Sequence, residues 1–345
     1  MKRFFRMAVL FAACAVCCGC AAEGPKRVQS VDTAMGTVIQ QSIYKVGEDA
    51  DETGEIMDII RGLEEKLLSR RLETSEIYAV NRSAGNPEGM NVSEELAQTL
   101  RHCLEVTERS DGAFDVTLGP VIKLWDIDGW AAGLQDGEFQ APSAGELALA
   151  LSSCGSQKMR LEQGANGTKL YLEEGMEIDL GAVGKGLALT EILAYLEDHQ
   201  DISGAVISVG GSVLTYGEKP DGTSWRVGVA DPGEPSTNLG VIVLEGQWCV
   251  STSGDYERYV EAGGVRYHHI LDPVTGCPAD SGLRSVTVVS KDGQLSDALS
   301  TACFVLGQEK GMALAKFYDA EALFVTDGGS IVMTPGMETL FQLAR

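Results

Sequence analysis

The sequence predicts an α+β protein, a single domain with mixed or antiparallel sheets and packed helices. Three observations indicate this class. Segments with apolar residues at helical spacing are interspersed with short alternating segments typical of strands. The 345 residues, 44% of them hydrophobic and 22% charged, are sufficient for one large core. The chain shows no internal repeat and no clear linker after residue 27.

The first twenty residues have the pattern of an export signal. Basic residues precede an apolar run, 7–16, that is too short to span a bilayer as a mature helix. The run ends in small residues and cysteines, as in a bacterial lipoprotein signal; an ordinary secretory peptide is the alternative. We expect the lipid on Cys20, because Gly19 precedes it and a polar linker, 21–27, follows, with Cys18 as the second candidate. The folded domain would then span 28–345.

This signal predicts a protein that works outside the cytoplasm. The expected location is the outer face of the cytoplasmic membrane, through the lipid anchor, or the periplasm. The net charge of −23 argues against nucleic acid as a partner, because such proteins usually present a basic surface. The five cysteines beyond the signal form no Cys-x-x-Cys pair. We expect buried free thiols, with one disulfide as the alternative, at Cys103, Cys154, Cys249, Cys277 and Cys303.

The first half of the chain is predicted to alternate strands, helices and loops. Polar residues around Ser93 and Ser143 have the pattern that begins a helix, and Ser143 forms a capping box with Glu146. The expected elements are a strand interrupted by a turn (28–44), a helix (51–68), a less regular segment (69–81), a helix (93–109), a surface loop (126–142) and a helix (143–154).

The second half is predicted to be richer in strands. An alternating segment, 169–178, leads into a glycine-rich turn and then a helix, 187–196. Near the C-terminus, residues 327–329 form a turn signal between two strands. The further expected elements are strands at 205–209, 225–229, 240–244, 249–252, 265–271 and 284–289, helices at 296–306 and 309–318, and a hairpin of 322–325 with 331–333.

The glycine-rich turn at 179–186 is the central candidate for ligand binding. Its glycines allow close backbone approach, and the start of the following helix offers N–H donors, which together suit a phosphate. Lys185 adds a positive charge, and Asp179 could bond a ligand donor or help hold a cation. The spacing of Gly181, Gly184 and Gly186 fits neither a P-loop nor a Rossmann loop. Taken alone, the segment fits better a turn that merely packs a helix on a sheet.

A carboxylate and a hydroxyl stand four residues apart in the predicted helix 296–306. Asp297 and Thr301 therefore share one helix face. Such hard oxygen ligands suit Mg²⁺, which takes its remaining ligands from water and phosphate. The alternative is structural, with Asp297 serving the helix dipole and Thr301 on a polar face.

Two adjacent histidines stand near the end of a predicted strand. In a strand His268 and His269 point to opposite faces, so at most one is expected to serve a given site. A histidine beside the turn signalled by Asp272 and Pro273 could act as a general base, or could bond the backbone of that turn. The hydroxyl-rich segment 250–256 could bond a ligand or cap its own turn.

Seven short motifs follow one another from about residue 30 to the C-terminus. They are TAMGT (33–37), GAFDVTLGP (112–120), DLGAVGKG (179–186), VGGS (209–212), TSGDY (252–256), HILDPVTG (269–276) and DALST (297–301). Each motif is weak alone, but seven in this order form a specific match. The chain resembles the ApbE family, the FAD:protein FMN transferases, many of which are exported lipoproteins.

The resemblance implies a T-fold-like α+β core that binds FAD and Mg²⁺, with His269 at the position of the family's reactive histidine. Ser212 stands where many members carry Asp, and Val274 where Arg or Lys is common, so the ligand contacts of these two positions are not carried over. The residues implied to contact FAD are Met35, Tyr78, Ala113, Phe114, Asp115, Asp179, Lys185 and Ile270; those implied to hold Mg²⁺ are Asp297, Thr301 and the carbonyl of Ala182.

The implied function is Mg²⁺-dependent transfer of FMN from FAD to a Thr or Ser hydroxyl of an exported or membrane flavoprotein, with release of AMP. His269 would accept the hydroxyl proton, with an imidazole pKa close to its ideal for this role. The resemblance suggests subunits of ion-pumping redox complexes or extracellular flavoproteins as acceptors. Two alternatives stay open: an FAD pyrophosphatase that uses water as acceptor, and a non-catalytic lipoprotein that binds FAD.

Overall fold

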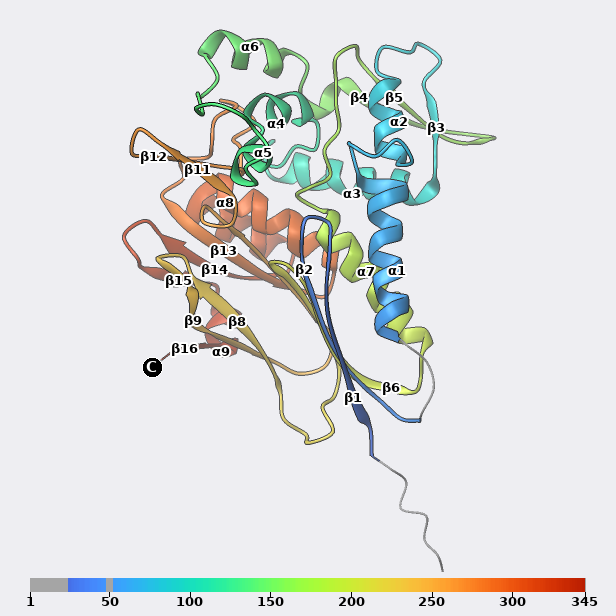
Figure 1. Ribbon diagram of the computed structural model, residues 1–345, viewed down its shortest axis with the longest axis vertical. Coiled ribbons are helices and arrows are strands. Elements are labelled where there is room, and N and C mark those ends of the chain that lie inside the picture. The colour runs from blue at the N-terminus through green and yellow to red at the C-terminus, as the bar shows by residue number, and fades with distance from the viewer. Residues whose placement is uncertain (1–23, 48–51, 345) are drawn as a thin grey trace, which may run out of the picture.

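The computed structural model describes residues 24–47 and 52–344, and a large antiparallel sheet forms its centre (Figure 1). The sheet's alternating apolar residues face a continuous core. In spatial order its strands are β1 (Lys26–Ala34), β2 (Thr37–Lys45), β6 (Ile202–Val209), β7 (Ser212–Gly217), β10 (Trp248–Gly254), β13 (Leu283–Ser290), β14 (Glu321–Thr326) and β15 (Ile331–Met333), each antiparallel to the next.

One face of this sheet is covered by helices and the other by a smaller sheet. Helices α7 (Gly184–Asp198) and α8 (Gly293–Phe317) pack on each other and on the central strands, and α1 (Glu52–Leu63) lies against α7 and β1 (Figure 1). A π-helical turn, Glu64–Leu68, continues α1. The smaller sheet has the order β16 (Phe341–Leu343), β9 (Glu234–Leu244), β8 (Trp225–Asp231), and α9 (Pro335–Leu340) precedes β16. Every second residue of β8, from Trp225 to Val229, is buried in a second core.

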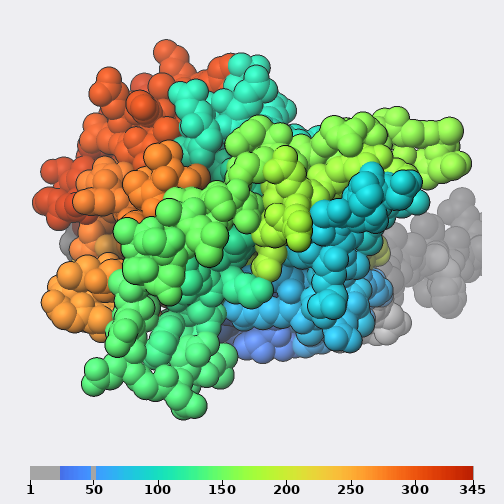
Figure 2. All heavy atoms as spheres, turned by 90° about the horizontal axis from the view of Figure 1, so that it is seen from above, coloured from blue at the N-terminus to red at the C-terminus, as the bar shows by residue number. Residues whose placement is uncertain are grey.

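A third group of elements forms an upper layer. One part consists of α2 (Glu76–Arg82), α3 (Glu94–Arg109) and a small sheet of β3 (Met90–Val92), β5 (Gly167–Leu172) and β4 (Met159–Gly164). The other part consists of α4 (Gly119–Trp125), α5 (Ile127–Ala131), α6 (Ala144–Ser152) and a hairpin of β11 (Tyr259–Ala262) with β12 (Val265–His268). This second part has its own apolar core around Trp125, and its residues 119–155, in green, lie on the upper surface in Figure 2.

Most of the predicted elements are confirmed. Ser93 caps α3 and Ser143 closes its capping box with Glu146, as the sequence indicated. The two predicted C-terminal helices are parts of α8, separated by a kink at Gly307 (φ 78°). The predicted hairpin at the C-terminus is β14 and β15.

Other predictions are wrong. The irregular segment 69–81 contains the start of α2, and the loop 126–142 contains α5. The strand predicted at 169–178 ends at Leu172, because Gly175 (φ 83°) turns the chain. The strand predicted at 265–271 ends at His268, and β4, β7 and β11 were not expected.

The export signal lies outside the described residues, and the first strand begins at Lys26, within the predicted linker. Among the described residues, no helix is both long and apolar enough to cross a bilayer. The five cysteines of this part are free, as expected; burial is confirmed for four of them, whereas Cys277 is only partly buried. Burial raises the pKa of the Cys103, Cys249 and Cys303 thiols to about 12.

Candidate active site

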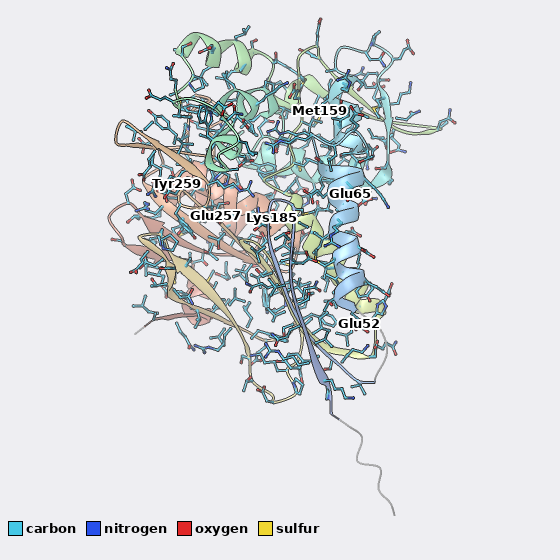
Figure 3. All side chains as sticks on the ribbon, viewed as in Figure 1. Glu52, Glu65, Met159, Lys185, Glu257 and Tyr259 are labelled. Carbon is cyan, nitrogen blue, oxygen red and sulfur yellow. The ribbon has the colours of Figure 1, made fainter. Side chains whose placement is uncertain are left out.

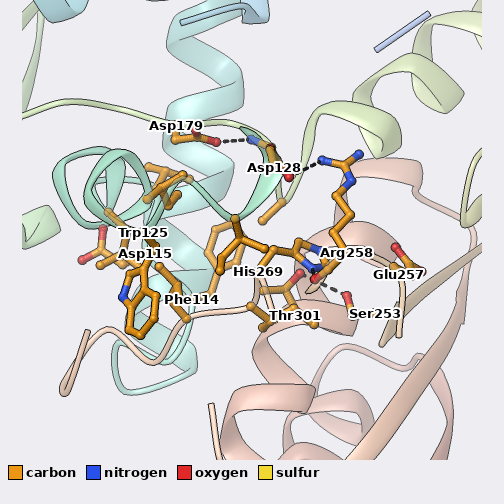
Figure 4. Close-up of a pocket in the computed structure, with 18 of the residues that line it drawn as sticks. Phe114, Asp115, Trp125, Asp128, Asp179, Ser253, Glu257, Arg258, His269 and Thr301 are labelled. Carbon is orange, nitrogen blue, oxygen red and sulfur yellow. Dashed lines mark hydrogen bonds and ion pairs between the residues drawn. The ribbon is translucent and has the colours of Figure 1, made fainter. Parts of the chain in front are cut away.

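A cavity of about 140 Å³ lies where the upper layer meets the ends of α7, β10 and β12 (Figure 4). Phe114 and Trp125 form an apolar side, while His269 and Thr301 approach from the opposite side. Nine of the residues predicted for the site line this cavity: Ala113, Phe114, Asp115, Asp179, Ala182, Lys185, His269, Ile270 and Thr301. Segments as far apart in the chain as 113 and 301 are therefore brought together as predicted.

The glycine-rich turn differs from the expected phosphate cradle. Its residues 180–183 lead into α7, which begins at Gly184. Four of its backbone N–H groups already donate within the protein, so the expectation that they are free for a phosphate is wrong for these four. The donors are Gly181, Val183, Gly184 and Gly186, and their acceptors are Asp179 Oδ1, the Leu180 carbonyl twice and Asp297 Oδ2, at 2.8–3.1 Å. An anion here would meet the Lys185 ammonium instead, which lies near the middle of the molecule (Figure 3).

Asp179 is held by a partner that the sequence did not indicate. Arg70, from the segment after the π-helical turn, places its Nε 2.7 Å from Asp179 Oδ2, and both side chains are largely buried. Asp179 Oδ1 accepts the Gly181 N–H at 2.8 Å. Its carboxylate therefore orders the turn and brings Arg70 into the cavity lining.

Asp297 lies behind the cavity wall, 2% exposed, on the first turns of α8. Its Oδ2 accepts the Gly186 N–H at 2.9 Å, and Lys185 Nζ lies 3.4 Å from Oδ1. Ser212, the residue that departs from the family pattern, has its Oγ 3.4 Å from the same Oδ1. The N-cap of α8 is Asp292, whose carboxylate accepts the Leu295 N–H at 2.9 Å, so Asp297 stands further along the helix than its first residues.

Thr301 follows one helical turn after Asp297 and faces the cavity. Its hydroxyl lies 3.2 Å from the Ser253 Oγ of β10, which also lies 2.7 Å from the Ser300 Oγ. The hydroxyl-rich segment 250–256 thus bonds α8 and lines the cavity at Thr252 and Ser253. Among the residues that the structure describes, no three His, Cys, Asp or Glu side chains gather as a metal cage.

The two histidines point to opposite sides, as predicted. His268 is buried, and its Nε2 lies 3.1 Å from the Ala279 carbonyl. His269 lines the cavity, and its Nδ1 lies 3.2 Å from the Arg258 carbonyl. A carbonyl can only accept, so Nδ1 carries the proton and Nε2 is the free acceptor.

The imidazole of His269 is less basic than expected. Burial, together with the positive charges of Arg258 and Lys185, lowers its pKa to about 4, against the opposing effect of Asp128. The sequence led us to expect a value near the ideal for a base at neutral pH, so this expectation is wrong for the protein without ligand. The ring is therefore neutral at physiological pH.

Three charged residues that the sequence did not indicate complete this side of the site. Arg258 Nη1 lies 3.2 Å from Asp128 Oδ1, which joins the loop before β11 to α5 (Figure 4). Glu257 lines the same cavity and points away from Arg258 in the close-up. Its enclosure by protein raises the pKa of the Glu257 carboxyl, and Asp297 adds to this, while Lys185 opposes it. The adjacent TSGDY motif was the only local signal for Glu257 and Arg258.

The remaining predicted residues support the cavity or lie beside it. Asp115 Oδ1 accepts the Thr117 N–H and its hydroxyl at 2.8 and 2.7 Å, so this carboxylate shapes its own turn. Tyr78 and Met35 lie outside the lining. Met35 stands at the β1–β2 turn with φ 50°, and its N–H donates to Glu64 Oε2 at 2.8 Å. A non-glycine residue in this left-handed region is uncommon and is often found at functional positions.

A neutral base, a lysine, a buried carboxylate and an ordered hydroxyl around one cavity define a site suited to phosphoryl transfer, which depends on positioning and charge neutralisation. The ApbE family model matches residues 35–324, and the chain belongs to this family. A curated FAD:protein FMN transferase from Treponema pallidum is 34% identical over 340 residues, covering 93% of this chain and 91% of that protein. Another, from Klebsiella pneumoniae, is 34% identical over 303 residues, covering 87% and 89%.

Solved structures agree with this assignment. The ApbE protein of Thermotoga maritima superposes with a TM-score of 0.80 at 30% identity, covering 91% of this chain and 99% of that one. The flavin transferase ApbE of Vibrio cholerae gives a TM-score of 0.78 at 26% identity, covering 92% and 99%. The predicted α+β class and family are therefore confirmed.

Proposed function

We propose that this protein is an FAD:protein FMN transferase that moves FMN from FAD onto a Thr or Ser hydroxyl of an exported flavoprotein. Family membership over most of the chain supports the activity. The observation that carries the chemistry is His269, whose protonated Nδ1 is held by the Arg258 carbonyl so that a bare Nε2 remains for a hydroxyl proton.

The reaction balances as one displacement at phosphorus. The acceptor oxygen forms a bond to the phosphorus of the FMN phosphate, and the bond from that phosphorus to the bridging oxygen breaks. AMP leaves with the bonding electrons, and the hydroxyl proton passes to Nε2 of His269. Lys185, whose side chain is 19% exposed, supplies positive charge beside the phosphates.

The donor set also fits Mg²⁺. Asp297 is a buried carboxylate whose nearest cation is Lys185 at 3.4 Å, and Thr301 and Ala182 stand at the adjacent cavity wall. Asp297, Thr301 and the Ala182 carbonyl would hold the ion, leaving positions for phosphate oxygens. When bound, Mg²⁺ would neutralise charge that develops on the pyrophosphate.

We assign Met35, Tyr78, Ala113, Phe114, Asp115, Asp179, Lys185 and Ile270 to FAD binding on the family resemblance. The apolar wall of the cavity and the cations Arg70 and Lys185 support this assignment. The signal at 1–20 supports export and a lipid anchor. The acceptor would then be a flavoprotein outside the cytoplasm, with membrane subunits of redox complexes as the first candidates.

The test uses residues 24–345 with FAD, Mg²⁺ and a candidate acceptor domain from an exported flavoprotein that carries the Thr or Ser to be modified. A fluorescent acceptor band on a denaturing gel, with one AMP per flavin attached, is the expected result. Free FMN and AMP without a band would identify a pyrophosphatase. Bound FAD without AMP would identify a non-catalytic flavin carrier.

A further inference from the structure

A second, larger hollow of about 920 Å³ opens beside the active site. The two hollows share five lining residues, so they are immediate neighbours: Asp128, Lys185, Thr252, Glu257 and Arg258. Figure 3 places Lys185 and Glu257 close together near the middle of the molecule, at this junction. We call the second hollow the β8 groove, because residues 226–228 and Ala230 of β8 line one side of it.

The β8 groove is built like a site for an extended chain. Val206, Ser208, Val213 and Val250, from three adjacent strands of the large sheet, also line it. β8 is the terminal strand of the smaller sheet, so on that side its backbone has no strand partner in the described part of the chain. A free strand edge beside a sheet surface binds extended peptides by adding a strand. The seven residues of β8 offer an edge of about 20 Å.

The charge of the β8 groove differs from that of the whole protein. The chain carries a net charge of −23, yet four cations line this hollow against two carboxylates, Asp128 and Glu257. The cations are Arg71, Lys185, Arg226 and Arg258. Lys185 and Arg258 are paired at the junction with Asp297 and Asp128. Arg71 and Arg226 line only the β8 groove; Arg71 Nη2 lies 3.8 Å from Asp126 Oδ1, and Arg226 Nη1 donates to Gln342 Oε1 at 3.3 Å. A segment with carboxylates would be attracted here and repelled elsewhere on the acidic surface.

We propose that the β8 groove docks the acceptor protein, as an extended acidic segment that pairs with the edge of β8. This inference rests on the proposed function and adds the place where the acceptor binds. The segment's Ser or Thr would lie at the junction, because Arg258 both lines the groove and holds His269 through its carbonyl. Arg226 and Arg71 would contact carboxylates on either side of that hydroxyl.

The first measurement compares Arg226→Glu and Arg71→Glu with the wild type, using as probe the acceptor domain that the wild-type protein labels in the test above. We expect the KM for the acceptor to rise about threefold to tenfold in each variant, since each reverses one partly screened charge. The KM difference should shrink in high salt, and the Kd for FAD should stay within about twofold. The matched control is Arg160→Glu on β4, an exposed arginine outside the groove that should leave the KM unchanged.

The second measurement needs no turnover. A photo-crosslinking amino acid at Arg226, in protein that also carries His269→Ala, should form a covalent adduct with the acceptor domain, whereas the same group at Arg160 should not. An unchanged KM in both charge variants together with no adduct at 226 would overturn the docking site, even if the wild type labels the acceptor. A large loss of FAD affinity in Arg226→Glu would also overturn it, because the groove would then bind FAD. Absence of labelling and AMP in the wild type would instead reject the proposed function, and the adduct would still report on docking.

Discussion

His269 shows how a single side chain can be poised by its neighbours. Its Nδ1–H is fixed by a carbonyl, and burial with two nearby cations lowers its pKa to about 4. The imidazole is therefore already neutral and able to accept a proton near pH 7, but it is a weak base. Bound phosphates would counter the cations and raise the pKa in the complex with FAD.

This arrangement predicts the pH dependence of kcat/KM for FAD, which reports the free enzyme. Protonation disables the base, so the rate should be level near neutrality and fall as pH falls through about 4. In Arg258→Gln the removed positive charge should raise this midpoint. Arg266→Gln is the control, since Arg266 pairs with Asp255 and Glu261 instead. A midpoint that stays in place in Arg258→Gln would contradict the electrostatic cause.

The single side chain of Asp297 gives a second prediction. Asp297→Asn keeps the shape of the side chain but removes its charge, so Mg²⁺-dependent transfer should fall by about 100-fold or more. Asp292→Ala in the same helix removes the N-cap and should cost about 1 kcal/mol of stability while keeping the Mg²⁺ dependence. Activity with Mg²⁺ and thermal melting of both variants separate the two effects. Full activity in Asp297→Asn would reject the metal assignment.

The sequence predicted single residues well where the chemistry lay in one motif. Asp297 and Thr301 are four apart on one helix, so spacing alone placed them together. Arg70 and Arg258 were missed because their partners, Asp179 and Asp128, are more than a hundred residues away in the chain. The hydrogen bond of the Gly186 amide was missed for the same reason, because its acceptor is a carboxylate of another helix. The other three amides of the 179–186 turn donate to Asp179 and Leu180 within the turn itself, so their bonds depend on its local conformation.

At the scale of elements, the crossing of α7 and α8 positions the site. A Cβ on Gly186 would lie 2.2 Å from the Gly293 carbonyl oxygen and 2.7 Å from Asp297 Cβ. Only glycine permits the backbones to approach this closely, and the approach brings Lys185 to Asp297. The glycine motif thus serves helix packing as well as the cavity, which was the structural alternative drawn from the sequence.

Gly186→Ala should therefore destabilise the protein by about 1–3 kcal/mol, because overpacking shifts α8 and with it Asp297. Transfer activity should fall more than stability alone explains. Gly62→Ala in α1 is the matched control: nothing lies within 4 Å of its Cβ, and alanine favours the helix by about 0.5–1 kcal/mol. Denaturant unfolding measures the stability of each variant, and FAD turnover measures its activity. A stable, active Gly186→Ala would show that the close approach of α7 and α8 is not required.

Elements with a regular apolar pattern and a cap were predicted, and short ones were not. α3 and α6 have capping serines that mark their starts. α5 has only five residues within a polar, glycine-rich stretch, and tertiary contacts around Trp125 decide its conformation. β11 likewise exists because β12 pairs with it.

For the whole molecule, the part of the upper layer around Trp125 has its own small core, and we expect this part to open separately from the central sheets. Trp125 ties that layer together by donating its indole N–H to the Gly276 carbonyl at 2.6 Å and packing on Phe139 and Tyr267. The same ring lines the active-site cavity. The sequence predicted one mixed domain but not this division of the core, because it arises from contacts between segments 119–155 and 259–280.

Trp125→Phe keeps an aromatic ring but leaves the Gly276 carbonyl unpaired. Amide hydrogen exchange in residues 119–131 should become about tenfold faster or more, and FAD should bind more weakly, while exchange in β13 stays unchanged. The control is Trp248→Phe, whose indole N–H donates to the Glu245 carbonyl on a different part of the molecule. Equal exchange in the two variants would show that the layer does not open on its own.

The buried thiols have a consequence for how this protein resists oxidation. Cys103, Cys249 and Cys303 are fully covered, and the raised pKa of each, about 12, keeps the sulfur protonated. Oxidants react with thiolates, so these three sulfurs are passive in the folded chain and become reactive only when it opens. The rate at which a thiol reagent labels these three cysteines therefore measures how often the core opens. Oxidation of the same cysteines is expected to be limited by the same opening rate.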